Sequence, residues 1–182
     1  YDIILWDGES AEMPVWNPEA NDGKGQYEIY TPAQLAGFAA MVNNGGLQQS
    51  AVTNNYKTSK YVLMDNINLD GQQWTPVNGF QGTFEGNGKI IMNLNVQTEG
   101  KASAGLFANC KGYIQNLTVE GAIVSGHYKT GVIVGNGLCS RINDCKVLNS
   151  TVTVTPYDKD DANNVGGIVG YLSAENEAWV KG

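Results

Sequence analysis

Apolar residues follow a helical period in one short stretch of the chain. From Leu35 to Val42 they recur at i, i+3, i+4 and i+7, which places them on one face of a helix. The preceding residues Thr31-Pro32-Ala33-Gln34 form a capping box, with Thr as the N-cap and Gln three residues later. The following Asn43-Asn44-Gly45-Gly46 suits a left-handed C-cap. The pattern predicts one helix over residues 32–43.

From Tyr61 onward, the apolar residues occur in short runs separated by Gly or Asn, a pattern typical of strands and turns. The strongest turn signal is Glu85-Gly86-Asn87-Gly88. The expected strands are Tyr61–Met64, Ile67–Leu69, Lys89–Val96, Leu106–Phe107, Tyr113–Val119, Gly131–Val134, Ile142–Val147, Thr151–Thr155 and Gly167–Tyr171.

Two motifs repeat within these runs. Ile91-Met92-Asn93-Leu94-Asn95-Val96 has the form I-x-[N/D]-[L/C]-x-V, which returns at residues 114–119 and 142–147, after offsets of 23 and 28 residues. Glycine-led apolar segments begin at Gly105, Gly131 and Gly167. Interleaved motifs that keep the same order predict stacked repeats. Two inward ladders are then expected, one of Ile91, Ile114 and Ile142 and one of Leu94, Leu117 and Cys145.

A period in the twenties with short strands in each unit is typical of a β solenoid, whose successive coils pair about 4.8 Å apart. Residues 61–182 would form a parallel β-helix of about five coils. An irregular segment, residues 1–26, and a segment containing the helix, residues 27–60, would precede it. The alternative is an antiparallel β-sandwich, which also alternates strands and turns but gives no reason for the motifs to align.

Composition narrows the choice of partners. The 182 residues hold 18 Asp and Glu against 11 Lys and Arg, a formal net charge of −7 with no cationic run, which argues against nucleic acid and anionic membranes. The 23 Gly favour an all-β chain that turns often. No apolar run approaches the roughly 18 residues of a membrane span. Because the chain starts at Tyr1 rather than Met, a processed or excised piece is expected.

Several segments carry a resemblance to a known family: residues 27–36, Asp65-Asn66-Ile67-Asn68-Leu69, Trp74-Thr75-Pro76-Val77, and residues 82–88. Together with the glycine-led segments, they resemble the GLUG-motif repeat family of adhesin-like surface proteins of Bacteroidetes and Firmicutes. The sequence departs from that pattern at Glu85 and Lys89, where the family has Asp and His. The resemblance implies a right-handed parallel β-helix closed at its N-terminal end by the helix, on a secreted or surface-attached protein. It implies no catalytic residue.

The acidic loop at residues 158–164 is a weak calcium candidate. Asp158, Asp160 and Asp161 offer the oxygen ligands that Ca²⁺ prefers. An EF-hand loop has Asp or Asn at the position of Ala162 and a Gly after it, so the spacing does not match. A solvated loop between two coils is the favoured interpretation, and no metal or other cofactor is expected.

Catalysis would require converging groups. Glycoside hydrolysis uses paired carboxylates, and the candidates by type are Asp65, Asp70, Glu85, Glu99, Glu120 and Asp144. Most stand beside Gly or Asn, where carboxylates serve turns and solubility. His127 could act with Ser125, but neither a nucleophile elbow nor an orienting acid accompanies them. The sequence therefore predicts a protein that is not an enzyme.

The ends of the stack complete the prediction. Five aromatic residues could stack on sugars or, as favoured here, pack over the open coil ends: Trp6, Trp16, Tyr27, Tyr30 and Trp179. No further I-x-[N/D]-[L/C]-x-V follows Gly170, so Ala178–Val180 is expected to cover an incomplete coil, with Trp179 as the plug, or another chain covers it.

The predicted function is therefore a non-enzymatic, extracellular or cell-surface module that acts in binding or as a spacer. Its expected partner is a host or bacterial surface ligand, a glycan or a protein, and self-association through the C-terminal coil end is a further possibility. The alternative is a polysaccharide-binding or polysaccharide-processing β-helix.

Overall fold

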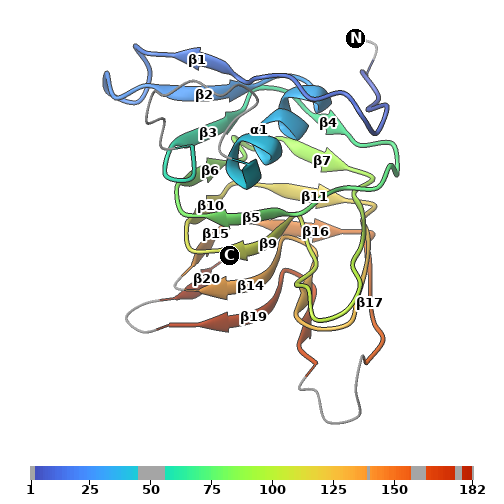
Figure 1. The fold of residues 1–182 in the computed structure, drawn as a ribbon. Coiled ribbons are helices and arrows are strands. Elements are labelled where there is room, and N and C mark those ends of the chain that lie inside the picture. Colours follow the sequence, from blue (N-terminus) through green and yellow to red (C-terminus); the bar gives the residue numbers. More distant parts are fainter. Residues whose placement is uncertain (1–2, 45–55, 139, 157–162, 175–177, 182) are drawn as a thin grey trace.

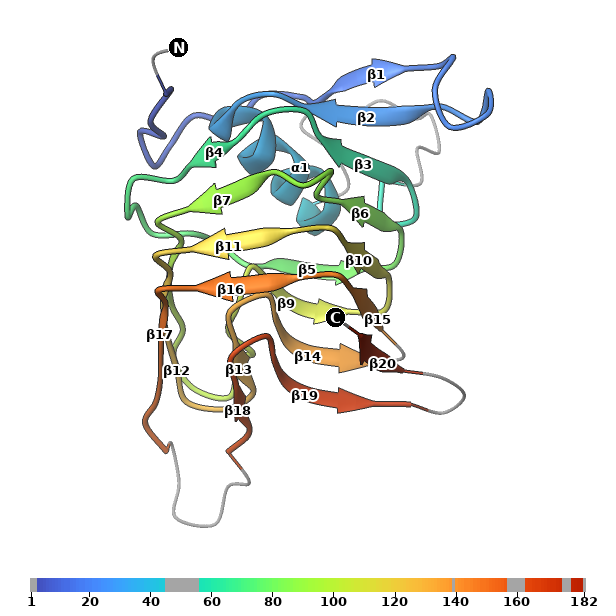
Figure 2. The same ribbon diagram turned by 180° about the vertical axis from the view of Figure 1, so that it is seen from behind.

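The structure, a computed structural model, describes residues 3–44, 56–138, 140–156, 163–174 and 178–181. Within these residues the protein is mainly β, with the single helix α1 (Pro32–Asn44) and parallel strand pairing in every sheet (Figures 1 and 2). The antiparallel sandwich is therefore wrong, since the described strands pair antiparallel only where β1 meets β2.

The strands form five sheets, numbered here in the order in which the chain visits them. Sheet 1 contains β1 (Val15–Asn17), β2 (Gln26–Ile29), β3 (Lys60–Leu63), β6 (Thr83–Glu85), β10 (Tyr113–Gln115), β15 (Arg141–Asn143) and β20 (Trp179–Lys181). Sheet 2 contains β4 (Ile67–Asn68), β7 (Ile90–Met92), β11 (Thr118–Glu120) and β16 (Lys146–Leu148). Sheet 3 contains β8 (Asn95–Gln97), β12 (Ile123–Gly126) and β17 (Thr151–Val154). Sheet 4 contains β13 (Thr130–Gly131) and β18 (Val165–Gly166). Sheet 5 contains β5 (Val77–Phe80), β9 (Phe107–Cys110), β14 (Val134–Leu138) and β19 (Val169–Ser173).

The chain passes through these sheets in one repeated order, which we call a circuit. Strands β10 to β14 pass through sheets 1 to 5 in turn, and β15 to β19 repeat the passage directly beside them. The described strands make circuits that start at Lys60, Thr83, Tyr113 and Arg141, and β20 begins another (Figure 2). Each strand of one circuit thus lies beside its counterpart in the next.

Apolar side chains stack between circuits and form the core. In sheet 1, Phe84 lies beside Tyr61 on one side and Ile114 on the other, and all three are fully buried. The same stacking in sheet 5 aligns Phe107 with Val134. Side chains alternate along a strand, so each short strand contributes one or two residues to the interior. The core is therefore built by registration between circuits rather than by any one strand.

Residues in the left-handed backbone conformation turn the chain between sheets. Asn116 (φ 54°) and Asp144 (φ 50°) turn it from sheet 1 to sheet 2, whereas Asn93 (φ 57°) and Asn149 (φ 49°) turn it from sheet 2 to sheet 3. Asn and Asp adopt this conformation more readily than other residues with a side chain. The runs expected as single strands at 89–96, 113–119 and 142–147 are therefore each two strands joined by a corner.

These corners overturn part of the expected ladders. Ile91 lies in sheet 2 beside Val119, so it is not aligned with Ile114, which pairs with Ile142 in sheet 1. Leu94 follows the corner at Asn93, and its carbonyl accepts a hydrogen bond from the backbone N–H of Ile123. At both Asn93 and Asn116 a left-handed residue is followed by a buried leucine, so these two corners share a motif although they lie at different places in the circuit.

The second ladder is divided accordingly. Leu94, Leu117 and Cys145 are all buried, but Leu94 lies at the corner between sheets 2 and 3. Leu117 and Cys145 both lie at the corner between sheets 1 and 2. The backbone N–H of Lys146 donates to the Leu117 carbonyl at 2.9 Å, which places these two residues in adjacent circuits.

Helix α1 covers the N-terminal edge of sheet 5, where it contacts β5 (Figure 1). The N-cap is confirmed, because the Gln34 N–H donates to Thr31 Oγ1. The return bond of the expected capping box is displaced by one residue, since Gln34 Oε1 accepts from the Tyr30 N–H rather than from that of Thr31. Phe38 inserts into the core, with its ring centroid 4.4 Å from that of Tyr61. The N-terminal segment, expected to be largely irregular, also contributes β1, which pairs with β2.

At the C-terminal end, the chain continues the stack instead of plugging it. Trp179 lies beside Arg141 and Val180 beside Ile142, so residues 179–181 form the next strand of sheet 1. Trp179 is 38% exposed, and the expectation that it plugs the end of the stack is wrong. This strand does not carry the repeated motif, because Val180 stands where the motif has Ile and Gly182 stands where it has Asn or Asp.

Candidate functional site

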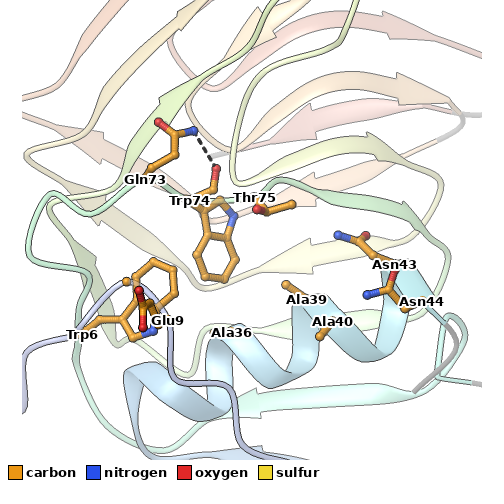
Figure 3. Close-up of a pocket in the computed structure, with 11 residues that line it drawn as sticks. Trp6, Glu9, Ala36, Ala39, Ala40, Asn43, Asn44, Gln73, Trp74 and Thr75 are labelled. Atoms are coloured by element: carbon orange, nitrogen blue, oxygen red, sulfur yellow. Dashed lines mark hydrogen bonds between the residues drawn. The ribbon is translucent and has the colours of Figure 1, made fainter. Parts of the chain in front are cut away.

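Two adjoining hollows lie on the helix side of the molecule. The helix pocket, of about 240 Å³, lies between α1, the N-terminal segment and the turn at residues 73–75. Figure 3 shows Trp6 and Trp74 at one side of it and Asn43 at the end of α1 on the other. The sheet groove, of about 640 Å³, lies over sheet 5 and the loop at residues 98–103. Asn43 and Thr75 line both hollows, which therefore lie side by side.

The helix pocket has a rigid floor. Trp6 and Trp74 are buried and pack edge to face, with ring centroids 5.6 Å apart. Trp6 Nε1 donates to the Ser10 carbonyl and Trp74 Nε1 donates to the Leu106 carbonyl, so both indole N–H groups are satisfied. The opposite wall is formed by the small side chains of α1, Ala36, Ala39 and Ala40.

A row of asparagine side chains crosses the outer face of sheet 5 and lines the sheet groove. Asn136 Nδ2 donates to Asn109 Oδ1 at 2.7 Å, and Asn109 Nδ2 donates to Asn78 Oδ1 at 2.8 Å. Asn43 anchors the row to the helix, because its Oδ1 accepts from the Asn78 N–H at 2.7 Å. We call Asn78, Asn109 and Asn136 the amide row. Its members come from β5, β9 and β14, one from each successive circuit.

Lys129 contacts the amide row at Asn136. Lys129 Nζ donates to Asn136 Oδ1 at 3.2 Å and lies 3.9 Å from the ring centroid of Tyr171. Tyr171 takes the place of the asparagine in the next circuit, since it pairs with Asn136. Tyr128 also lines the groove, and its ring centroid lies 5.2 Å from the same ammonium. The groove is thus lined by amides, by Lys101 and by the Tyr128 ring, and Lys129 and Tyr171 lie beside its Asn136 end.

Two of the carboxylates proposed from the sequence are engaged by amide groups. Glu85 accepts a hydrogen bond from the Asn87 N–H in its own circuit, and it accepts bonds from Gln115 Nε2 and Asn116 Nδ2, which tie it to the next circuit. Glu120 accepts from Asn149 Nδ2 at 3.1 Å in the same way. Across the described residues, no group of three or more His, Cys, Asp and Glu side chains is arranged to hold a metal ion. Asp158, Asp160 and Asp161 lie outside those residues.

His127 contacts the backbone of the next circuit, and Cys110 and Cys145 are buried. His127 Nδ1 lies 2.8 Å from the Thr155 carbonyl oxygen, so the imidazole links two circuits. Cys110 is fully buried, and burial raises the pKa of its thiol to about 11. Burial also raises the pKa of the Cys145 thiol. Neither thiol is available as a nucleophile near neutral pH.

The aromatic residues that were expected to pack over the ends of the stack differ in burial. Tyr27 is buried and stacks on Tyr61 with ring centroids 5.1 Å apart, which covers the N-terminal end of the core. Trp16 packs against Tyr27 at 4.8 Å, although about half of its surface remains exposed. Tyr30 is 43% exposed, and its hydroxyl donates to Glu28 Oε2. Trp6 alone of the predicted set lines the helix pocket.

The amide row is not among the sites predicted from the sequence. Its signal was present, because Phe107-Ala108-Asn109 and Val134-Gly135-Asn136 both follow the glycine-led segments, with an Asn two residues after the inward apolar one. Asn78 was harder to find, because a register shift separates it from Val77 in the pairing with β9. An alignment on the leading glycines does not pair the other two either, because Asn109 lies four residues after Gly105 and Asn136 lies five after Gly131.

Comparisons with known proteins give limited similarity. The chain is 34% identical over 101 residues to a stretch of halomucin from Haloquadratum walsbyi (strain DSM 16790 / HBSQ001). The matched stretch is 54% of this chain but 1% of the halomucin chain. No protein-family model matches the chain, and no solved structure matches it. Helix α1, the one helix among the described residues, is not long and apolar enough to cross a membrane.

Proposed function

We propose that this chain is a non-enzymatic module of an extracellular or cell-surface protein, built as a right-handed parallel β-helix and serving in binding or as a spacer. The observation that carries this proposal is the repeated circuit, in which successive passages of the chain add parallel strands to the same sheets in the same order. Such a stack makes a stiff scaffold whose loops vary without disturbing the core.

Two further observations support a surface module. The segments at residues 27–36 and 82–88 resemble repeats of GLUG-motif, adhesin-like surface proteins. The similarity to a short stretch of halomucin, which carries a mucin-type name, points in the same direction. The proposed ligand is a surface glycan or protein, and a further proposal is self-association through the strand edges at the C-terminal end.

The carboxylate positions support a function without catalysis. Glu85 and Glu120 are engaged by amide side chains of the next circuit. Among the described residues, those lining the sheet groove include no Asp or Glu, so the groove lacks the carboxylate pair that glycoside hydrolysis uses.

Labelling of source cells tests the location. An antibody raised against this chain is expected to label intact cells as strongly as permeabilised ones, or to detect the protein in the medium. Labelling only after permeabilisation would contradict the proposal. An antibody against a cytosolic protein provides the control for membrane integrity.

A polysaccharide panel tests the absence of catalysis. Incubating the purified chain with neutral and uronate-containing polysaccharides should release neither reducing ends nor unsaturated sugars above a heat-treated control. Release of either product would favour the alternative, a polysaccharide-processing β-helix.

A further inference from the structure

We propose that the sheet groove and the adjoining helix pocket bind an extended neutral oligosaccharide, with the amide row as the recognition element. This inference rests on the proposed binding function and specifies its ligand. It starts from the shape, since the two hollows share Asn43 and Thr75 and together run from Trp6 at one end to Tyr128 at the other.

The amide row retains hydrogen-bonding capacity. A carboxamide offers two N–H donors and two acceptor lone pairs. Asn109 uses one donor on Asn78 and one lone pair on Asn136, which leaves one donor and one acceptor. Asn78 Nδ2 donates to no atom of the described residues, and its side chain is exposed. The row can therefore both donate to and accept from a ligand.

This balance fits hydroxyl groups better than charged groups. A sugar hydroxyl both donates and accepts, whereas a carboxylate or phosphate only accepts. Two lysines stand at the groove: Lys129 is already directed at Asn136 Oδ1 and at the Tyr171 ring, and Lys101, which lines the groove, also has an interaction within the protein. A neutral polyol uses both halves of each amide, and an acidic chain would leave the carbonyl oxygens opposed to its negative charge.

The spacing of the row fits a chain of sugars. Its members come from successive circuits, and paired strands lie about 4.8 Å apart. That distance is close to the length of one pyranose unit, so neighbouring amides meet neighbouring sugars. Tyr128 lines the same groove and supplies an aromatic surface on which the apolar face of a sugar ring packs.

The row is also preorganised. Asn43 holds the backbone of Asn78, because its Oδ1 accepts from the Asn78 N–H and its Nδ2 donates to the Pro76 carbonyl at 3.1 Å. The Asn78 carboxamide is held by Asn109 Nδ2, and the Asn136 carboxamide is held by Lys129 and Asn109. Side chains that are already ordered lose little conformational entropy when a ligand binds. The three amides are therefore held ready at fixed positions along the groove.

Titration calorimetry with defined hexasaccharides tests the proposal. The probes are cellohexaose, mannohexaose, xylohexaose, laminarihexaose and maltohexaose, with hexagalacturonate as the acidic comparison. We expect at least one neutral probe to bind the wild type, and Asn109→Leu to weaken that binding by about tenfold or more. The matched control Gln115→Leu removes an outward amide that bridges circuits in sheet 1, donating to Glu85 Oε2, and should bind like the wild type.

Three outcomes would overturn the proposal: no neutral probe binds at millimolar concentration, hexagalacturonate alone binds, or Asn109→Leu binds as tightly as the wild type. If Asn109→Leu does not fold, Tyr128→Ala replaces it. Side-chain amide NMR signals of the wild type, assigned to the row, should shift on titration whether or not any variant folds. Surface labelling of intact cells is independent of these titrations, so a failed groove and a failed surface location give different results.

Discussion

Single residues at the corners decide where each strand ends. Asn116 and Asp144 hold positive φ at the same corner in adjacent circuits. Asn93 and Asn149 hold positive φ at the next corner, two circuits apart. Each of these residues costs less in the left-handed region than a residue without a short polar side chain. The corner side chains also bond between circuits, as Asn93 Nδ2 does to Asn68 Oδ1 at 2.9 Å.

Replacing Asn116 by alanine should test how much its positive φ and its side-chain hydrogen bonds contribute to stability. Asn116→Ala loses the tolerance of φ 54° and the bonds to the Glu85 carboxylate, so the free energy of unfolding should fall by about 1–2 kcal/mol. Asn116→Gly keeps the backbone tolerance and loses only the bonds, so its loss should be smaller. Urea unfolding measures both. Equal losses would show that the backbone conformation contributes nothing.

The thiol of Cys110 should be unreactive in the folded protein. Its pKa is raised to about 11 by burial, which outweighs the lowering by the Gly112 N–H and Ser140. At about pH 8, iodoacetamide should modify Cys110 in urea but not in buffer, as read by mass spectrometry of its peptide. Modification at equal rates in both would contradict the buried position.

The same shift makes stability depend on alkaline pH. The unfolded thiol ionises near its ordinary pKa, about 9, while the folded thiol keeps its proton up to about 11. The unfolded state therefore binds fewer protons in this interval, and the free energy of unfolding falls as pH rises. Cys110→Ala should show a shallower fall than the wild type in urea titrations across this interval. Identical slopes would argue against the shift.

At the scale of elements, glycines allow the circuits to approach one another near sheets 4 and 5. A Cβ atom on Gly105 would lie 2.5 Å from the Gly131 carbonyl oxygen, and one on Gly131 would lie 2.5 Å from the Gly170 nitrogen. Gly131 pairs with Gly166 rather than with Gly167, the residue that the motif alignment chose. The glycine-led repeat thus marks positions at which the backbones of neighbouring circuits touch.

Alanine scanning of two glycines should separate this contact from ordinary loop glycines. Gly131→Ala should lower the free energy of unfolding by about 2–3 kcal/mol, because the new Cβ overlaps backbone atoms that cannot move aside. Gly167→Ala places its Cβ in open space and should change it by less than about 0.5 kcal/mol. Neither glycine has a positive φ, so backbone strain does not contribute to the difference between the two variants. Similar losses in both variants would contradict the packing argument.

At the scale of the whole molecule, burial decreases from the helix-covered end to the C-terminal end. Ile114 and Ile142 are fully buried, whereas their neighbour Val180 is 45% exposed. Each circuit is covered by the next one, and the last strands of the five sheets have a partner on one side only among the described residues. The stack is therefore expected to be least stable at the C-terminal end.

Two identical truncations should reveal this gradient. Val119 is fully buried between β7 and β16, so Val119→Ala should lower the free energy of unfolding by about 2 kcal/mol. Val180→Ala removes the same atoms from a half-exposed site and should cost less than about 1 kcal/mol. Thermal unfolding measures both. Equal losses would mean that the last strand is covered in solution, which would support the self-association proposed above.

Metal removal should leave the molecule unchanged. The described core is held by apolar columns and by amide bonds at the corners, with no acidic cluster among the described residues. The melting temperature in EDTA should therefore equal that in buffer. A fall of several degrees, reversed by added Ca²⁺, would instead assign a metal-binding role to Asp158, Asp160 and Asp161.

The sequence by itself determined the local features of this protein. The helix at residues 32–44 follows from its period and its N-cap, both of which depend on residues within a few positions of one another. The repeated motifs also identified the inward residues, since an apolar residue after a left-handed Asn turns inward at any corner. These are short-range effects, so a linear pattern contains them.

Only the tertiary structure decided which copies of a motif lie together. Ile91 and Ile114 stand in the same local pattern but in different sheets, because that pattern occurs at two different corners of the circuit. The amide row likewise exists only because Asn78, Asn109 and Asn136 come from separate circuits. Strand register depends on burying apolar side chains across distant segments, and that packing energy is a property of the assembled stack rather than of any one segment.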